Sequence, residues 1–422
     1  MKLDPGRLPG LLARGALPIA VAVAVQSAGN LAFHAAVGRL LDADAYGALG
    51  TVLAAMMMLG VPLGAVQTAA SALVAEHGLS RASARRTLRL VALWSLGPAL
   101  AVLACAPLLR DYFHLAGPAE AAQLAPYLMI AAVVAAARGL LLGARRVGAV
   151  AVTYLVATAV RLALGLALVV PFGVSGALAA TVLAELAALL VAAGPLRHPD
   201  GAGTPGALRL GAVAHAGFAV TGLFLFSTVD LLLARHHLRD GSSGAYIAAA
   251  TVAKTVLALP AGIMAAVFPR LLAGWLRPGR GRVLATGGLA VAGPALLGAA
   301  VIVAVPSLVL RLLYGDGYTD ADGLVRALAG VAALTSLVTV LTYAALARRA
   351  RTLVIPWLGA ALEVALIETW HDSAAQIALC SAAALVPTLL LMLVLEARVW
   401  ARPTAQLGPA GAEEARSAAT AA

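Results

Sequence analysis

"GRLLDADAYGALGTVLAAMMMLGVPLGAVQ", residues 38–67, places a short acidic turn before a long apolar run that meets a proline. A helix needs about 20 apolar residues to cross the roughly 30 Å of hydrocarbon in a bilayer. Proline removes a backbone hydrogen bond and clashes with the preceding helical turn, so Pro62 should kink the helix. The stretch therefore predicts a membrane-spanning helix that is interrupted at Pro62.

The whole chain has the composition of a membrane protein. Its 422 residues are 62% hydrophobic and 12% charged, with a mean hydropathy of +0.94. Soluble domains carry about 25% charged residues, so this chain lacks the polar surface of a soluble protein. We expect an all-α polytopic membrane protein with twelve spans. The predicted spans are 15–37, 47–75, 90–109, 123–144, 147–170, 174–195, 210–234, 244–268, 286–313, 325–346, 352–371 and 374–396.

The positive charges predict an orientation. The net charge of +11 would suggest nucleic acid as a partner of a soluble protein, but the positive-inside bias explains it here, and no nucleic-acid partner is expected. With a cytoplasmic N-terminus, inner segments hold twenty Arg and Lys residues and outer loops hold five. The chain is thus predicted to lie in the cytoplasmic (inner) membrane with both termini in the cytoplasm.

The opening stretch recurs 198 residues later as "LRDGSSGAYIAAATVAKTVLALPAGIM", which begins at Leu238. The matched pairs are Leu40 with Leu238, Asp42 with Asp240, Leu59 with Leu257, Pro62 with Pro260 and Gly64 with Gly262. Six spans in each half put both halves in the same orientation, as in parallel repeats around a central cavity. We expect six-helix bundles at 1–200 and 210–400, a linker at 201–209, a disordered tail at 401–422, and hinges at Pro62 and Pro260. A duplicated scaffold without transport is the alternative.

Two of these stretches resemble a known family. "GRLLDADAYGAL" with "LGVPLGAVQTAASALVAE", and "VDLLLARHHLRDGSSGAYIAAATVAKTVLALPAGIMAAVFPRL", are similar to the helical hairpins that open each half of polysaccharide flippases. These flippases belong to the multidrug/oligosaccharidyl-lipid/polysaccharide exporter superfamily. The resemblance implies alternating-access transport of a polyprenyl-pyrophosphate-linked oligosaccharide for cell-surface polysaccharide biosynthesis. It also implies membrane lipids and a polysaccharide polymerase or glycosyltransferases as partners. Many members have fourteen spans, whereas twelve are predicted here.

Cations inside predicted spans point to an anionic substrate. A central charge costs about 2.5–3.5 kcal/mol on insertion scales, so it needs a partner or a function. Arg161 shares a helix face with Tyr154 and Thr158, and Lys254 lies beside Thr251 and Thr255. We predict that Arg161, Lys254 and Tyr154 bind substrate. The alternative is internal ion pairing, with Glu185, Asp230 and Glu363 as candidate partners.

Further polar residues recur every four positions on the first span. Gln26, Asn30 and His34 should face the cavity or a neighbouring helix, because hydrogen-bonding groups that face lipid are costly. They are predicted to contact sugar, with helix packing as the alternative. Asp230 and Glu363 are candidates for coupling to protons or sodium, with structural pairing as the alternative. Arg138, Arg270 and Arg326 lie near span ends and are expected to snorkel toward the interface.

Other functions are less consistent with the chain. A phosphate-binding loop, a large outer loop with catalytic carboxylates and a nucleophile–base constellation are all missing, so no enzyme, catalytic residue or cofactor is predicted. No metal site is expected: the acidic residues Asp316, Asp320 and Asp322 read as a solvated loop. A membrane glycosyltransferase is therefore disfavoured. A cation-coupled drug or small-molecule antiporter of the same superfamily remains the alternative function.

Overall fold

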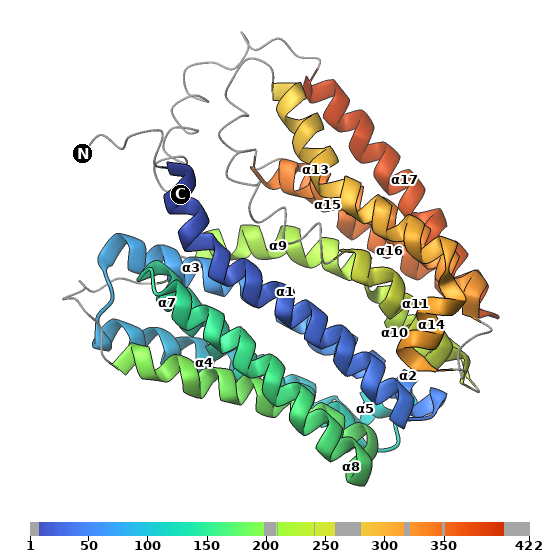
Figure 1. Ribbon diagram of the computed structural model, residues 1–422, viewed down its shortest axis with the longest axis horizontal. Helices are drawn as coiled ribbons and strands as arrows, with labels where there is room; N and C mark the ends of the chain where they lie inside the picture. Colours follow the sequence, from blue (N-terminus) through green and yellow to red (C-terminus); the bar gives the residue numbers. More distant parts are fainter. Residues whose placement is uncertain are drawn as a thin grey trace. The chain divides into compact units, whose positions relative to one another are not determined.

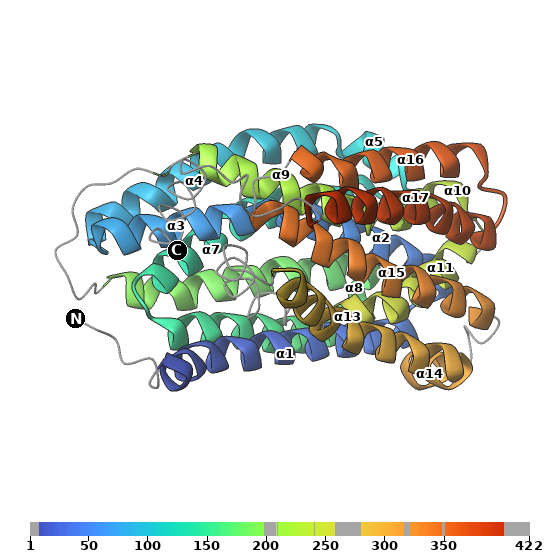
Figure 2. The ribbon, with the colours of Figure 1, turned by 90° about the horizontal axis from the view of Figure 1, so that it is seen from above.

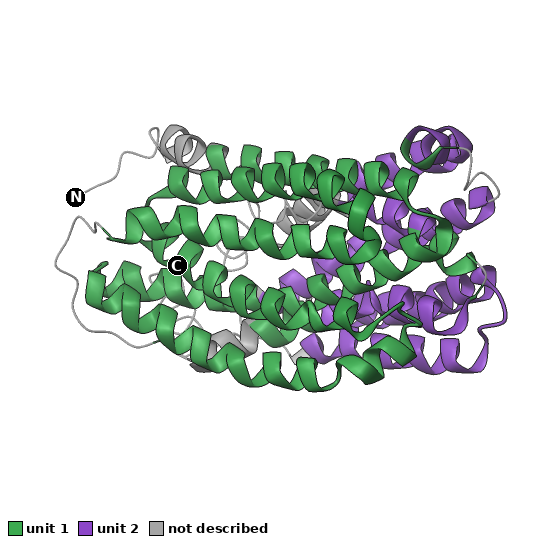
Figure 3. Cartoon of the chain, turned by 90° about the horizontal axis from the view of Figure 1, so that it is seen from below, with its two compact units in different colours: residues 1–221, 239–247, 313–317 green, residues 222–238, 248–312, 318–422 purple. Residues whose placement is uncertain are grey.

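The computed structural model describes residues 8–197, 208, 210–239, 241–257, 280–315, 321–347 and 351–400. All regular structure in these ranges is helical. The chain divides into two compact units, drawn in green and purple in Figure 3. Unit 1 comprises residues 1–221, 239–247 and 313–317, and unit 2 comprises residues 222–238, 248–312 and 318–422. The predicted linker at 201–209 lies outside the described residues, apart from Leu208.

Unit 1 is built from helices α1 to α8, to which parts of later helices, residues 210–221, 242–247 and 313–314, are added. Their bounds are α1 Leu8–Leu40, α2 Ala43–Gly60, α3 Leu63–His77, α4 Arg81–Ala104, α5 Ala106–Tyr112, α6 Pro118–Ala122, α7 Leu124–Gly143 and α8 Val147–Arg197. Side-chain caps mark two helix starts: Asp42 accepts a hydrogen bond from the Ala45 amide (2.8 Å), and Ser80 accepts one from the Ser83 amide (3.1 Å). In Figures 1 and 2, α1 and α7 run alongside α8.

Helix α8 contains two antiparallel arms. Its backbone leaves the helical region at Gly173, where φ is 54° and ψ is −134°. Beyond this point the chain reverses, and contacts between the two arms show this. Ala157 packs in one cluster with Ala184 and Ala188, and the Arg146 guanidinium donates to the Pro195 carbonyl. The reversal separates the two spans predicted at 147–170 and 174–195.

The predicted interruption at Pro62 is present. Helix α2 ends at Gly60 and α3 begins at Leu63, and the next amides bond three residues back, from Gly64 to the Val61 carbonyl and from Ala65 to the Pro62 carbonyl (both 3.1 Å). Proline has no amide hydrogen to continue the ladder. The matching Pro260 lies outside the described residues.

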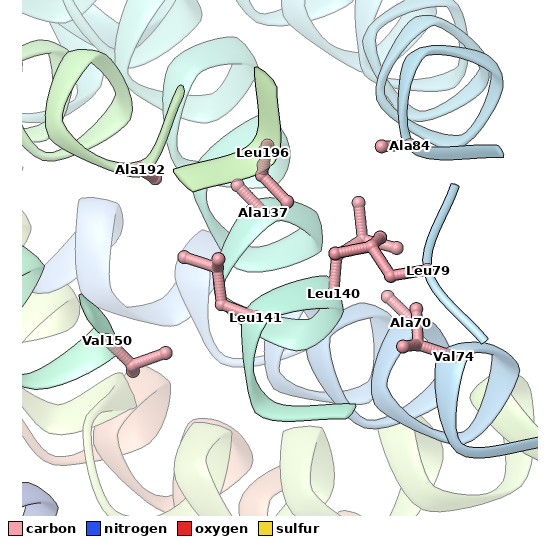
Figure 4. Packing of buried hydrophobic residues seen from close by; sticks show 10 residues of the cluster. All are labelled: Ala70, Val74, Leu79, Ala84, Ala137, Leu140, Leu141, Val150, Ala192 and Leu196. Atoms are coloured by element: carbon pink, nitrogen blue, oxygen red, sulfur yellow. The ribbon is translucent and has the colours of Figure 1, made fainter. Parts of the chain in front are cut away.

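Glycines let the helices of unit 1 pack closely. A Cβ added at Gly139 would collide with the Gln67 carbonyl of α3, and one added at Gly143 would collide with the Ser71 carbonyl. Next to this contact lies an apolar cluster that joins α3, α4, α7 and both arms of α8 (Figure 4). Its buried members are Ala70, Val74, Leu79, Ala84, Ala137, Leu140, Leu141, Val150, Ala192 and Leu196. Helix association in lipid depends on such close contacts, since lipid tails are as apolar as leucine.

Unit 2 holds most of the later helices, although α9, α11 and α14 have residues in both units. The bounds are α9 Leu210–Phe226, α10 Val229–His237, α11 Ser242–Lys254, η1 Thr255–Leu257, α13 Arg280–Ala304, α14 Pro306–Tyr314, α15 Asp322–Ala347, η3 Arg351–Val354, α16 Ile355–Thr369 and α17 Ala374–Trp400. The predicted span 286–313 is not one straight helix, because α13 and α14 meet at 87°. The bend falls at Pro306, and proline interrupts the hydrogen-bond ladder at such a position.

The prediction of an all-α polytopic membrane protein is confirmed. Within the described residues, eight helices are long and apolar enough to cross a membrane, or ten if each of two bent pairs is one span. The 51-residue α8 is one of the eight and contains two predicted spans. The predicted eighth span, 244–268, is described only as far as Leu257.

The internal repeat also recurs in the helix boundaries. Helices α2, α5 and α7 begin at residues 43, 106 and 124, and α11, α14 and α15 begin at residues 242, 306 and 322. Each pair of starts is separated by 198 to 200 residues. The register inferred from two short sequence motifs therefore extends to three helix starts in each half.

The glycine contact predicts a stability difference. Gly139→Ala should lower the apparent melting temperature by several degrees, because overpacking at a backbone contact costs about 1–3 kcal/mol. Gly330→Ala in α15 is the matched control, since a Cβ there meets nothing within 4 Å. Melting of the purified protein in detergent measures both. Equal melting temperatures for the two variants would contradict this account of the α3–α7 packing.

Candidate functional site

The crossing of α1 and α8 brings two of the predicted substrate residues together in unit 1. Arg161 Nη1 donates to Asn30 Oδ1 at 2.7 Å, and the guanidinium carbon lies 4.2 Å from the centroid of the Phe33 ring. Arg161 Nε is buried without a hydrogen-bond partner. None of the carboxylates that the structure describes lies within 4 Å of Arg161. The cation thus contacts an amide and an aromatic face, and its buried Nε donor has no partner.

Small residues make this approach possible. A Cβ at Gly29 would collide with the Thr158 methyl group, and a Cβ at Gly165 would collide with the Phe33 ring. The two helices therefore approach closely on both sides of Arg161. Thr158 Oγ1 donates to the Tyr154 carbonyl at 2.8 Å, so this hydroxyl is used within its own helix. Of the predicted polar stripe on α8, Arg161 is the member that donates a hydrogen bond to α1.

Arg138 forms a second charged contact in unit 1, and the expectation that it snorkels is wrong. Its side chain is buried, with Nε donating to Thr153 Oγ1 at 2.9 Å and Nη2 lying 3.9 Å from Glu185. The guanidinium carbon also lies 4.0 Å from the centroid of the Tyr154 ring. Predicted substrate residue Tyr154 is therefore partly covered by Arg138. The sequence does not indicate this contact, because Arg138 is close to the end of its predicted span.

The remaining predicted residues on α1 have different surroundings. His34 is buried, and its Nδ1 lies 3.0 Å from the Tyr46 hydroxyl, which in turn lies 2.9 Å from the Tyr314 hydroxyl. Gln26 is half-buried. The regular four-residue spacing of Gln26, Asn30 and His34 therefore does not produce one continuous polar surface. Asn30 contacts a cation, whereas His34 belongs to a buried chain of hydroxyl groups.

Unit 2 contains a cluster of one lysine and two acidic residues. Lys254 Nζ donates to both carboxylate oxygens of Asp230, at 2.6 and 2.8 Å. Glu363 on α16 is only 2% exposed, interacts electrostatically with both of these residues, and has one carboxylate oxygen without a hydrogen-bond partner. Ser381 on α17 lies within hydrogen-bonding reach of Glu363. The structure thus joins three residues that the sequence placed on three different spans.

Metal binding is not indicated by the described side chains, since no group of three or more His, Cys, Asp or Glu residues among them has the geometry to hold a metal ion. Asp316 and Asp320 of the predicted acidic loop lie outside the described residues. The roles predicted for substrate binding, ion coupling and hinge motion remain predictions. The structure shows which side chains surround the residues to which these roles are assigned.

Comparison with known proteins identifies the fold. No protein family and no curated sequence matches the chain. Among solved structures, it is similar to an inward-facing multidrug resistance MATE family transporter of the MOP superfamily, with a TM-score of 0.67, 16% identity, and coverage of 87% of this chain and 94% of the other. It is also similar to the lipid II flippase MurJ in an inward closed conformation, with a TM-score of 0.67, 10% identity, and coverage of 90% and 86%.

A third similar structure is a MOP superfamily transporter from Pyrococcus furiosus whose binding pocket is described as having reverse polarity. Its TM-score is 0.61 at 17% identity, with coverage of 91% of this chain and 94% of the other. At these identities the shared property is the fold. The chain therefore has the fold of MOP superfamily transporters, which include both drug transporters and a lipid flippase.

The two arginines of unit 1 should respond differently to truncation. Arg138→Ala leaves Glu185 without its ion-pair partner, and breaking a buried pair costs about 3–5 kcal/mol, so membrane abundance should fall several-fold. The double variant Arg138→Ala/Glu185→Ala should recover it. Arg161→Ala should leave abundance near wild type, because no described carboxylate is paired with it. Quantitative immunoblotting of membranes measures all three, and an equal loss in both single variants would contradict the assignment.

Proposed function

We propose that this chain moves a polyprenyl-(pyro)phosphate-linked oligosaccharide across the cytoplasmic membrane by alternating access, for cell-surface polysaccharide biosynthesis. The observation that carries the proposal is the guanidinium of Arg161. It lies inside a membrane helix without a paired carboxylate among the described residues, and one of its N–H groups has no partner. A phosphate group would supply the missing acceptor.

The charges around Arg161 support an anionic substrate. Unit 1 places two guanidinium groups, those of Arg138 and Arg161, near one carboxylate, that of Glu185. One positive charge is therefore in excess. Guanidinium presents a planar fork of donors that matches phosphate oxygens, whereas an ammonium group acts as a point charge. Arg161 has the better geometry for a diphosphate, and Lys254 is occupied by Asp230 in this conformation.

The remaining proposed roles follow from position. Asn30 and Gln26 offer amides to sugar hydroxyls near Arg161, and Tyr154 offers a phenol. His34 is engaged with Tyr46, so a sugar contact at His34 requires that hydrogen bond to exchange. The interrupted ladder at Pro62 provides a point where α2 and α3 can bend against each other, and we assign the same role to Pro260.

The coupling ion would bind in unit 2. Asp230, Glu363 and Lys254 together provide two carboxyl groups and one ammonium group, so one carboxyl group could take up a proton or bind a sodium ion. This cluster is also the observation that favours the second candidate function, a cation-coupled drug or small-molecule antiporter. We further propose that both termini are cytoplasmic and that a polysaccharide polymerase or glycosyltransferases act beside the transporter.

Translocation can be tested directly in proteoliposomes. A fluorescent polyprenyl-diphosphate oligosaccharide is incorporated, and the fraction that reacts with a membrane-impermeant glycosidase is followed over time. Arg161→Lys should retain part of the rate, Arg161→Ala little, and Arg161→Glu none, because the anion loses its attraction and is then repelled. Arg326→Ala is the matched control, since Arg326 bonds the Val303 carbonyl at an exposed site. Full translocation by Arg161→Ala would refute the proposal.

Ion coupling gives a separate measurement. With a sodium gradient or a pH gradient imposed in turn, Glu363→Gln should abolish the acceleration by the coupling gradient while slow exchange without a gradient continues. Glu368→Gln on the same helix is the control, because Glu368 is exposed and lies beside His237. If glycan movement is absent but a cationic dye is exported in a gradient-dependent way, the antiporter is the correct function.

A further inference from the structure

A pocket of about 230 Å³ lies at the arginine-rich end of unit 1, away from the Arg161 site. It is formed where the turn between α3 and α4 meets the turn between α7 and α8. Gly78 and Leu79 contribute from the first turn, and Gly143 and Ala144 from the second. The two charged side chains in its lining are Arg145 and Arg146, and no carboxylate lines it.

The backbone at Arg145 is unusual for an arginine. The residue follows the end of α7 with φ at 58°, in the left-handed region. The Arg146 amide donates to the Leu141 carbonyl (2.8 Å) and the Arg145 amide to the Leu142 carbonyl (2.9 Å), which is the Schellman arrangement. Glycine is strongly preferred at this position because a Cβ is disfavoured there. The turn itself would be satisfied better by glycine, so the arginine side chain needs another explanation.

Further positive charges surround the pocket. Arg81 and Arg85, both exposed, lie on the first turns of α4 immediately after the lining residue Leu79, and exposed Arg197 ends α8. The nearby carboxylate of Glu76 lies 4.0 Å from His77. The local field at this end is therefore strongly positive, and the complementary ligand is an anion.

The depth of the pocket selects the kind of anion. On α8 the first large apolar side chain that is exposed is Val152, six residues after Arg146, or about 9 Å along the helix axis. On α4 the large apolar residues that are exposed begin at Leu93 and Trp94. Apolar exposed surface marks the hydrocarbon, and tryptophan favours its boundary. Arg145 and Arg146 therefore lie at the level of the lipid headgroups.

We propose that this pocket binds the phosphate headgroup of an anionic phospholipid, with Arg145 as the principal contact. The Arg146 guanidinium is anchored on the Pro195 carbonyl, which orients the second cation at the same site. Basic pockets between membrane helices bind anionic headgroups by this chemistry. The bound lipid would connect the α3–α4 and α7–α8 turns, and it is distinct from the transported substrate of the proposed function.

Arg145→Gly provides a test that does not depend on transport. The full-length protein is placed in mixed micelles with phosphatidylglycerol or with phosphatidylcholine, and its melting temperature and retained lipids are measured by thermal unfolding and native mass spectrometry. Wild type should melt higher in phosphatidylglycerol, since a ligand that binds the folded state stabilises it. Arg145→Gly should bind phosphatidylglycerol about fivefold more weakly, which corresponds to about 1 kcal/mol for one arginine near an anionic surface.

Matched variants separate binding from folding. In phosphatidylcholine, Arg145→Gly should melt at or above the wild-type temperature, because glycine suits the turn. Arg145→Lys keeps the charge and should retain most of the lipid effect, and exposed Arg110→Gln removes one charge elsewhere and should retain all of it. Unchanged phosphatidylglycerol binding by Arg145→Gly would overturn the proposal. So would equally tight binding of soluble glycerol 3-phosphate or inorganic phosphate, which would identify a free anion as the ligand.

Discussion

A charged side chain in hydrocarbon must be compensated, because its transfer costs about 2.5–3.5 kcal/mol even on the mildest scales. This constraint orders the interior of both units. Arg138 meets Glu185 and Thr153, Lys254 meets Asp230, and Arg161 meets Asn30 and Phe33. Each contact joins residues on two different helical segments. The charged groups that make membrane insertion costly thus also help to determine which helices are neighbours.

Close helix packing is the condition for these contacts. Hydrophobic association gives little advantage inside lipid, so helices must touch through small residues. Gly29 and Gly165 bring α1 and α8 together on both sides of Arg161, and Gly139 does the same for α3 and α7. A larger residue at Gly29 or Gly165 would move α1 away from α8, and the Arg161–Asn30 distance of 2.7 Å would not survive such a shift. The contact between Arg161 and Asn30 therefore depends on the glycines beside it.

The features that depend on local chemistry can be predicted from the sequence. Apolar length predicted the membrane spans, Pro62 predicted the break between α2 and α3, and the aligned motifs predicted a repeat that the helix starts share. The 87° bend before α14 cannot be predicted in this way, since Pro306 signals an interruption but not its angle.

The partners of the charged residues also cannot be predicted from the sequence. Pairing across helices depends on the rotation of each helix about its axis and on its depth, which tertiary packing sets. Arg138 illustrates this, because a position near a span end is compatible with snorkelling or with burial against α8. Lys254 and Asp230 were recognised as charges that need partners, and the structure supplies the pairing.

The two candidate functions require substrates of opposite charge, so they differ in the sign of the charge that each site should carry. Unit 1 has an excess cation at Arg161, whereas the described cluster of unit 2 has two carboxylates for one ammonium. At an effective dielectric constant of about 20, a unit charge about 8 Å from Arg161 interacts by about 2 kcal/mol, or roughly thirtyfold in binding. A cationic drug is repelled by that amount at Arg161, and a diphosphate is attracted by more because it carries more charge. A small cation at the unit 2 cluster would meet two carboxyl groups, those of Asp230 and Glu363, and one ammonium group, that of Lys254. Under the proposed function, the anionic lipid and the coupling cation would each bind beside residues of complementary charge.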